Sequence, residues 1–279
     1  MKKLIFSLAI LCFGLISNAQ RSEIGGMFGT SFYMGDINPS TLFPNFKPCG
    51  GILYRYNFDS RWALKANILF ADVEASDMGT NNGYARNLSF RSPITEISAQ
   101  VELNFFNLYN IPARNHFSPY IYVGIDVFSF NPQAQINGVY YDLQSLGTEG
   151  QGLIEDFQPY NLVSMAIPFG MGLKLNAGKH ISFGLEWGMR YTFTDYLDDV
   201  SGVYFDNEAL KIQKGNLVAQ LADRSDIIHV AGTQRGNSKT KDWYSFAVFT
   251  MTFKIGNEDT SCNIRYNLKP KSNNSGTKY

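Results

Sequence analysis

The stretch RYTFTDYLDDVSGVYFDN, residues 190–207, contains four aspartates: Asp195, Asp198, Asp199 and Asp206. Clustered carboxylates can exchange protons with a substrate, ligate a divalent cation, or close a strand through Asx turns. The order D-x-x-D-D-x-x-G does not match the D-x-[DN]-x-[DN]-G loop that binds Ca²⁺ in EF-hands. We therefore interpret the stretch as a structural turn. A divalent ion held by Asp195, Asp198 and Asp199 is the alternative.

The second set of residues that could do chemistry is RSDIIH, where Ser225, Asp226 and His229 lie close together in the sequence. A catalytic triad is defined by geometry and not by proximity along the chain. The sequence has no G-x-S-x-G nucleophile elbow, no P-loop and no Cys/His spacing typical of a metal site. We therefore predict no catalytic, cofactor-binding or metal-binding residues, no enzyme activity, and no small-molecule substrate.

The two ends of the chain are expected to lie outside the folded domain. Residues 1–19 combine a basic start, Lys2 and Lys3, with an apolar run and the small-x-small site Ser17-Asn18-Ala19, which is typical of a secretory signal peptide cleaved after Ala19. Residues 257–279 are rich in Asn, Lys and Ser, and we expect a partly disordered periplasmic tail. The folded domain is then residues 20–256.

Charge and composition narrow the class of protein. Without Lys2 and Lys3, 22 basic residues face 24 acidic ones, so no electrostatic argument favours nucleic acid. No second apolar run reaches the roughly 18 residues of a transmembrane helix. Aromatic residues make up 15% of the chain and charged residues only 17%. A secreted chain with this composition is either a β-sandwich or an outer-membrane β-barrel.

Strict alternation of apolar and polar residues predicts β-strands. In ITEISAQVELNF, for example, Ile97, Ala99 and Val101 share one face, whereas Ser98 and Gln100 share the other. Eight segments show this period, most of them near the roughly 9–11 residues that cross a bilayer at a tilt. The segments are 23–33, 50–56, 62–74, 94–105, 120–128, 167–175, 181–191 and 243–255, and the first, second, third and last fit less perfectly.

The connections between these strands favour a barrel over a sandwich. Long connections alternate with short ones, and each odd connection is longer than each even one. Membrane barrels have long extracellular loops and short periplasmic turns, whereas a sandwich has no reason for this parity. We predict an all-β, eight-stranded antiparallel transmembrane β-barrel in the outer membrane, in contact with membrane lipid and with both termini in the periplasm.

The polar faces of the predicted strands carry five residues of each charge. Buried charges must be paired, and an eight-stranded barrel has room for side chains but not for a channel. We therefore expect a plugged lumen with an internal ion-pair network, in which glycines make space for the long charged side chains. The ten residues are Glu23, Glu96, Glu102, Asp126, Glu186, Arg55, Lys65, Lys174, Arg190 and Lys254.

Three further expectations concern single elements. Tyr56, Trp62, Trp243 and Tyr244 at strand ends suggest an aromatic girdle. Within the longest loop, Leu210, Leu217, Val218 and Leu221 share one helical face, which predicts a short helix packed on the barrel mouth although Gly215 weakens it. Cys49 and Cys262 belong to opposite ends of the predicted barrel, so we expect no disulfide between them.

Several motifs resemble a known family. They are GTSFYMGDINP, SPYIYVGIDVFSFNPQA, LGTEGQG, RYTFTDYLDDVSGVYFDN and RGNSKTKDWYSF. In this order they resemble the PorG-like outer-membrane proteins of Bacteroidetes, which are associated with the type IX secretion system. The resemblance implies a barrel without enzyme activity that links a periplasmic ring of the PorK–PorN type to the outer membrane. Contact with the ring would involve the turns at 57–61, 106–118 and 176–180 and the tail.

Two alternatives to the secretion role remain open. The first is a stand-alone small barrel for envelope integrity or surface adhesion. The second is a lipid-modifying enzyme, which would need a Ser or His at the lipid-facing rim, and the sequence offers no convincing one.

Overall fold

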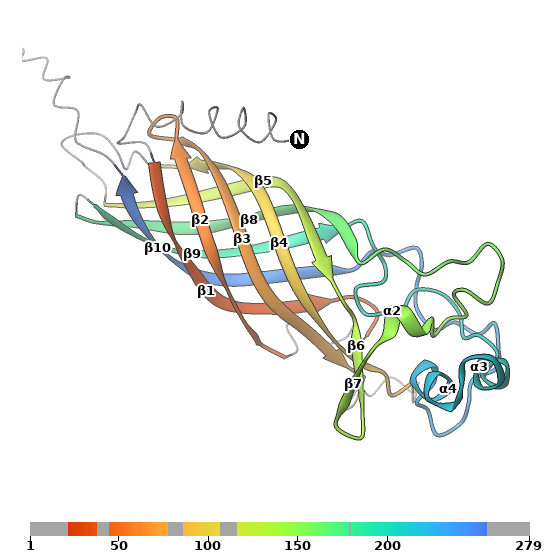
Figure 1. Cartoon of the computed structure of the whole chain (residues 1–279). Coiled ribbons are helices and arrows are strands. Elements are labelled where there is room, and N and C mark those ends of the chain that lie inside the picture. The colour runs from red at the N-terminus through yellow and green to blue at the C-terminus, as the bar shows by residue number, and fades with distance from the viewer. Residues whose placement is uncertain (1–21, 38–44, 78–85, 107–115, 179, 256–279) are drawn as a thin grey trace, which may run out of the picture. The chain divides into compact units, whose positions relative to one another are not determined.

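Eight long antiparallel strands form the wall of the structure (Figure 1). The computed structural model describes residues 22–37, 45–77, 86–106, 116–178 and 180–255. The predicted signal peptide and the predicted tail lie outside the described residues. The wall strands are β1 (Ser22–Met34), β2 (Lys47–Asn57), β3 (Trp62–Ser76), β4 (Ser89–Asn104), β5 (Phe117–Phe130), β8 (Val163–Ala177), β9 (Ile181–Thr192) and β10 (Trp243–Ile255).

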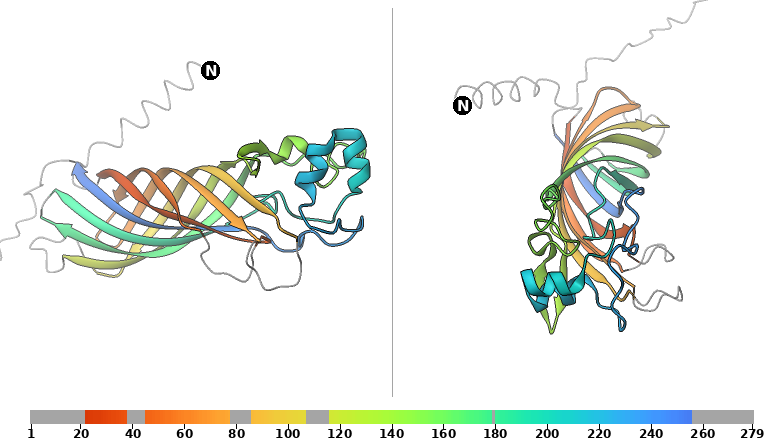
Figure 2. Two further views of the ribbon diagram at one scale, coloured as in Figure 1. Left: turned by 90° about the horizontal axis from the view of Figure 1, so that it is seen from below. Right: turned by 90° about the vertical axis from the view of Figure 1, so that its right-hand side faces the viewer.

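Hydrogen bonding between β3 and β4 closes the sheet into a barrel. The strands follow the order β3-β2-β1-β10-β9-β8-β5-β4, every pair is antiparallel, and β1 pairs with β10. A sandwich would need two separate sheets, so the closed, eight-stranded antiparallel barrel that the sequence predicts is confirmed. Figure 2 shows the strands tilted around a common axis.

Four connections gather at one end of the barrel and build a cap, by which we mean residues 35–37, 77, 86–88, 131–162 and 193–242. The cap contains the hairpin β6 (Gln133–Ile136) and β7 (Val139–Asp142), together with the helices α2 (Leu143–Leu146), α3 (Asn207–Lys214) and α4 (Asn216–Ala222). Figure 1 places all of these elements beyond the same ends of the wall strands. The described residues 58–61, 105–106, 116, 178 and 180 belong to connections at the opposite end.

Several strands are longer than the sequence pattern suggests. β3 has 15 residues, β4 has 16 and β8 has 15. Their cap ends continue beyond the clean alternation. As a result the β3–β4 connection (77–88) and the β4–β5 connection (105–116) have the same length, and the strict length parity predicted from the sequence is wrong for this pair.

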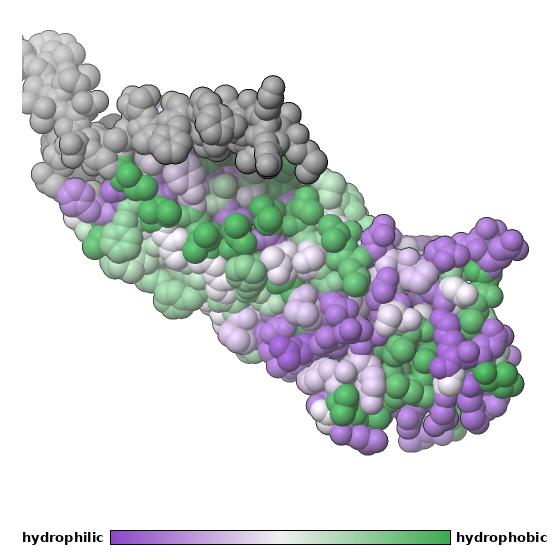
Figure 3. All heavy atoms as spheres, viewed as in Figure 1, coloured by the Kyte–Doolittle hydropathy of each residue, from purple (hydrophilic) through white to green (hydrophobic). Residues whose placement is uncertain are grey.

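Apolar side chains cover the outside of the wall. Ile97 is 59% exposed, Leu185 58% and Val127 48%, while their neighbours along each strand are buried. Figure 3 shows hydrophobic residues across the visible face of the barrel and a concentration of hydrophilic ones on the cap. In a soluble sandwich the apolar faces are buried and the polar faces meet water. Here the apolar face is outside, as in a barrel whose outer surface contacts lipid.

The inside of the wall has two zones, and only one of them is polar. Toward the cap, inward positions are occupied by apolar side chains such as Leu69, Val73, Phe128 and Phe246, which form a continuous buried cluster. The opposite zone contains the charged side chains. The apolar zone explains why 62–74 and 243–255 alternate imperfectly: inward residues such as Leu69, Val73 and Phe246 are apolar at positions where the pattern predicts polar ones.

The predicted aromatic girdle is correct only in part. Trp62 is exposed on the outer wall, and Tyr56 and Trp243 are partly exposed. Tyr244 instead points into the lumen, is fully buried and donates a hydrogen bond to Glu96. The alternation of β10 dictates this, because Tyr244 follows the outward Trp243.

Two remaining expectations concern helices and cysteines. Among the described residues, no helix is long and apolar enough to cross a membrane. Cys49 is buried on the inner face of β2 and carries a free thiol. Cys262 lies outside the described residues, so the absence of a Cys49–Cys262 disulfide stays a prediction.

Candidate functional site: a plugged lumen under a buried acidic cap

Glu102 is the centre of the larger charged network in the lumen. Its carboxylate accepts hydrogen bonds from Arg55 Nε at 2.8 Å and Lys174 Nζ at 3.0 Å, and Lys65 Nζ lies 3.4 Å away. Lys65 also donates to Glu186 at 2.5 Å. Each of these side chains is at most 5% exposed, so the charges neutralise one another in a space closed to solvent.

Glu23 extends this network toward the end of the barrel opposite the cap. It accepts from Arg55 Nη1 at 2.8 Å, Asn57 Nδ2 at 3.0 Å and Thr252 Oγ1 at 2.9 Å. The oxygens of Glu23 thereby connect strands β1, β2 and β10. The ion-pair network predicted from the inward charges is confirmed for these residues.

A second, smaller network lies between the first one and the apolar zone. Arg190 donates from Nε and Nη2 to the two oxygens of Glu96, at 3.1 and 3.2 Å, and Tyr244 donates to the same carboxylate at 2.9 Å. The Arg190 guanidinium also lies over the Phe246 ring at 4.4 Å. A bidentate pair and a stacked ring fix the guanidinium in one position.

Asp126 and Lys254 differ from the other eight predicted charges. Asp126 is 1% exposed and forms no ion pair within the described part of the chain. Lys254 is partly exposed near the end of β10. The lumen thus contains one more buried carboxylate than its ion pairs require.

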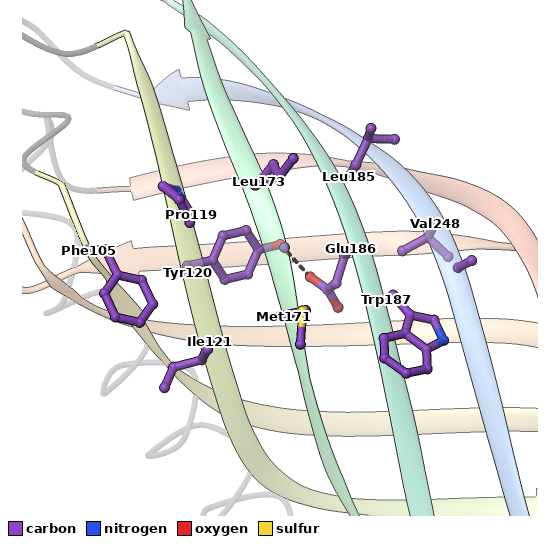
Figure 4. A pocket seen from close by; sticks show the side chains of 12 residues that line it. Phe105, Pro119, Tyr120, Ile121, Met171, Leu173, Leu185, Glu186, Trp187 and Val248 are labelled. Atoms are coloured by element: carbon purple, nitrogen blue, oxygen red, sulfur yellow. Dashed lines mark hydrogen bonds between the residues drawn. The ribbon is translucent and has the colours of Figure 1, made fainter.

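The inward glycines make room for tyrosine rings more than for charged side chains. The Tyr120 ring occupies the space that a Cβ of Gly172 would take, and the Tyr122 hydroxyl does the same at Gly188. Tyr120 can therefore cross the inside of β8 and donate to Glu186 at 2.7 Å (Figure 4). The expectation that glycines accommodate the long charged chains is corrected in this respect.

The outer wall over the same strands carries a shallow apolar depression of about 560 Å³. The outward side chains Ile121, Met171, Leu173 and Trp187 border it (Figure 4). Its accessible lining is almost wholly apolar, so it faces lipid and offers no polar group for catalysis.

The aspartates of the 190–207 stretch serve the cap as hydrogen-bond acceptors. Asp195 accepts from Ser201 Oγ at 2.6 Å. Asp199 accepts from Thr148 Oγ1 at 2.5 Å and from Tyr160 Oη at 2.7 Å. The two bonds of Asp199 join the 131–162 loop to the 193–242 loop, whereas the bond of Asp195 closes a turn within the 193–242 loop. Both carboxylates therefore have the structural role that the sequence suggests.

Asp198 and Asp206 have separate roles. The Asp198 carboxylate accepts from the Val200 amide at 2.9 Å, which is an Asx turn. Asp206 accepts from the Ala209 amide at 3.1 Å and is the N-cap of α3. Asp206 therefore marks the start of a helix, whereas the other three aspartates belong to the cap core.

Glu149 and Arg235 form the main ion pair of the cap. Arg235 Nη1 lies 2.9 Å from Glu149 Oε1, and both side chains are 2% exposed. The amides of Ser201 and Gly202 also donate to Glu149, at 3.0 and 3.1 Å. Both members of the pair therefore bind the backbone of the TDYLDDVSG turn: Glu149 accepts from its amides, and Arg235 donates to the Asp199 carbonyl oxygen.

Tyr33 at the end of β1 connects the barrel to the acidic stretch. Its hydroxyl lies 2.5 Å from Asp198 Oδ2 and 2.8 Å from Asp242 Oδ1. Asp242 precedes β10 and also accepts from the Leu197 amide at 2.9 Å. The cap end of β1 and two separate parts of the 193–242 loop therefore meet at one phenol oxygen.

Burial changes the acidity of the cap aspartates. Desolvation raises the pKa of Asp199 to about 6 and that of Asp198 to about 8. Asp242 has a pKa raised well above its ordinary value, first by burial and then by the neighbouring Asp198 charge. Burial likewise raises the pKa of Asp195 to about 6.

The arrangement of these carboxylates bears on the alternative of a bound divalent ion. Within the described residues, no three His, Cys, Asp or Glu side chains are arranged to hold a metal ion. Asp195, Asp198 and Asp199 turn toward different hydrogen-bond donors. Titration of the protein with Ca²⁺ tests whether a divalent ion binds at these aspartates.

Ser225 and His229 do come together, but around Asp223 and not Asp226. His229 Nδ1 lies 3.0 Å from Asp223 Oδ2, and Ser225 Oγ donates to Asp223 Oδ1 at 2.5 Å. Ser225 Oγ faces the same ring nitrogen, Nδ1, at 3.2 Å. A catalytic triad needs the serine and the acid on opposite nitrogens of the histidine ring. The three side chains here therefore only stabilise the fold of the loop. Asp226 is exposed and takes no part in the cluster.

The predicted single helix of the long loop is two helices. Gly215 has φ 97° and separates α3 from α4. Leu210, Val218 and Leu221 are buried and Leu217 is partly buried, as the helical face predicts. Their contacts include Leu146 of α2, so the helices pack on the neighbouring loop within the cap and not directly on the barrel mouth.

The sequence interpretation missed Tyr33, Glu149, Arg235 and Asp242 as parts of one cluster. Each of them lies in one of the motifs GTSFYMGDINP, LGTEGQG and RGNSKTKDWYSF. These motifs are far apart along the chain, and the barrel brings them to the same mouth. The motifs are visible in the sequence, but only the closed barrel shows that they are neighbours in space.

The closed wall, outward apolar face and plugged charged lumen define an outer-membrane-type β-barrel. Among solved structures, the chain is similar to Neisserial surface protein A (TM-score 0.42, 6% identity, 84% of this chain and 97% of that chain). It is also similar to OprG from Pseudomonas aeruginosa (0.39, 11%, 84% and 96%) and to Ail of Yersinia pestis (0.39, 9%, 84% and 97%). No curated protein matches the chain in sequence.

The chain belongs to the family described as Domain of unknown function (DUF6089), whose model matches residues 2–221. The match covers the predicted signal peptide from residue 2, all strands from β1 to β9, the helices α2 and α3, and all of α4 except its last residue, and it ends before β10.

Proposed function

We propose that the protein is a non-enzymatic outer-membrane barrel that holds a rigid cap on the outer surface of the cell as a structural or adhesive element. The observation that carries the proposal is the combination of a filled lumen with a cap fixed by buried ion pairs and hydrogen bonds. A filled lumen favours anchoring over transport. A rigid cap is a surface that a partner can bind without first ordering it.

The cap also exposes apolar side chains suited to contact. Ile212 on α3 is 82% exposed, Ile227 84% and Val230 74%. A triple substitution of these residues by serine removes apolar surface without touching the buried core of the cap. We expect cells with this variant to display the protein normally and to attach less to surfaces or to other cells. Unchanged attachment with normal display would reject the adhesive role.

A second candidate is the secretion role implied by the PorG-like motifs. The motifs support it, and the end of the barrel opposite the cap would provide the contacts with a PorK–PorN type ring, of which 57–61, 106, 116–118, 176–178 and 180 are described. An affinity pull-down from solubilised envelopes should recover ring subunits, and deletion of the gene should stop secretion of type IX cargo. Normal secretion in the deletion strain, without recovery of ring subunits, would leave the stand-alone barrel.

A further inference from the structure

The contacts of Tyr33 Oη require a proton beyond its own. A phenol oxygen has one hydrogen and two lone pairs. It already accepts from the Asp36 amide at 3.0 Å, and it lies within hydrogen-bond distance of Asp198 Oδ2 and Asp242 Oδ1. The hydroxyl can donate to only one of the two carboxyl groups. The other one must itself be protonated and donate to the phenol oxygen.

The charges around this cluster favour retention of that proton. Eight further groups act on Asp198, Asp242 or their acidic neighbours, or form an ion pair with a group that does. From the loops that meet at the mouth, the carboxylates are Asp36, Asp77, Glu149, Asp195 and Asp199, and the cations are Arg86, Arg235 and Lys241. Carboxylates outnumber cations. Arg86 is paired with Asp77 at 2.8 Å and Arg235 with Glu149 at 2.9 Å.

The position of the cluster makes the proton mechanically important. Tyr33 ends β1, Asp242 precedes β10, and Asp198 belongs to the acidic turn of the 193–242 loop. We propose that one proton shared by Asp198, Tyr33 and Asp242 locks this loop onto the barrel mouth, so that the cap loosens as the pH rises. The barrel wall, which is closed by backbone hydrogen bonds, stays intact.

The direction of the pH dependence follows from linkage. The docked cap holds the proton because Asp198 has a pKa raised from 3.8 to about 8, whereas a released loop would titrate near 3.8. The contribution of the proton to docking is therefore complete below about pH 4. It declines as the pH rises and is lost at about pH 8. Asp195 and Asp199, whose pKa values are raised to about 6, act in the same direction.

Hydrogen–deuterium exchange of the full-length mature barrel in lipid nanodiscs tests the lock. Protection of residues 193–242, corrected for the intrinsic pH dependence of exchange, should fall at least about tenfold between pH 5 and pH 9. Protection of the wall strands should not change. Asp198→Asn keeps a partner for Tyr33 that does not titrate, so its cap should lose most of this pH dependence, and Asp242→Asn should behave in the same way.

Two further variants separate the lock from general destabilisation. Tyr33→Phe removes the shared oxygen and should leave the cap weakly protected at both pH values. Glu208→Gln changes an exposed carboxylate on α3 and should keep the wild-type profile. Equal protection of the wild-type cap at pH 5 and pH 9 would overturn the proposal, as would a wild-type pH profile in both Asp198→Asn and Asp242→Asn.

Discussion

At the scale of single residues, the stability of the barrel depends on whether each buried charged side chain has an ion-pair partner. Glu102 faces Arg55, Lys65 and Lys174, whereas Asp126 has no ion pair within the described residues. Removing one member of a buried network leaves its partners uncompensated, which costs more than the network itself contributes. The two carboxylates therefore should respond in opposite ways to neutralisation.

Glu102→Gln should lower the free energy of unfolding by about 3–5 kcal/mol, because three cations lose their common partner. Asp126→Asn replaces a buried carboxyl group that has no ion pair within the described residues by an amide of the same shape, and it should be neutral or stabilising. Urea-induced unfolding of the refolded barrel in lipid vesicles measures both. If both variants lost the same stability, the assignment of Glu102 as the centre of the network would be wrong.

Gly172 offers a test of the inner packing. A Cβ at this position would collide with the Tyr120 ring, so Gly172→Ala should break the Tyr120–Glu186 hydrogen bond and lower stability by about 1–3 kcal/mol. Gly26→Ala is the matched control, because Gly26 lies on the outer face with only ordinary contacts. Equal unfolding midpoints for the two variants would contradict the inner packing described for Tyr120.

At the scale of elements, the cap is a folded unit whose parts come from distant loops. Arg235 of the longest loop neutralises Glu149 of the 131–162 loop and lies 3.7 Å from Asp199. α3 and α4 cover α2 through a small apolar cluster. Buried ion pairs, hydrogen bonds to Asp199 and Glu149, and apolar contacts thus hold the two largest loops together.

Arg235→Gln should loosen the cap by about 3–5 kcal/mol, because Glu149 stays buried without its cation. Arg224→Gln is the control, since Arg224 forms no ion pair within the described residues, and its effect should be clearly smaller. Limited proteolysis of the refolded protein should cut Arg235→Gln within 193–242 and leave the barrel fragments paired. Resistance of this variant at the wild-type level would show that the pair does not hold the cap.

The sequence predicts the wall better than the cap, and the reason is physical. Outward residues such as Ile97, and inward residues such as Glu102, alternate with period 2, which local pattern alone reveals. The meeting of Tyr33, Asp198 and Asp242 depends on barrel closure and on pairing of β1 with β10, neither of which is encoded in a short window. The prediction of Tyr244 as a girdle residue is wrong because it rested on the aromatic residue type, whereas the alternation along β10 directs this side chain into the lumen.

At the scale of the whole molecule, the central claim is that apolar wall side chains face acyl chains while charges are neutralised inside. The three tryptophans report on this without added labels. Trp187 lies on the outer face in the middle of β9, while Trp62 and Trp243 begin β3 and β10 at opposite ends of the barrel. One fluorophore is therefore expected deep in the bilayer and one near each surface.

The most direct measurement is tryptophan quenching in vesicles of acyl-brominated lipids, with a Trp62→Phe/Trp243→Phe variant that retains only Trp187. We predict strong quenching of Trp187 by bromine atoms near the bilayer centre and little quenching by aqueous iodide. The Trp187→Phe variant, which keeps the other two tryptophans, should be quenched best by bromine placed near the headgroups. Quenching of Trp187 by iodide and not by brominated chains would contradict a lipid-facing wall.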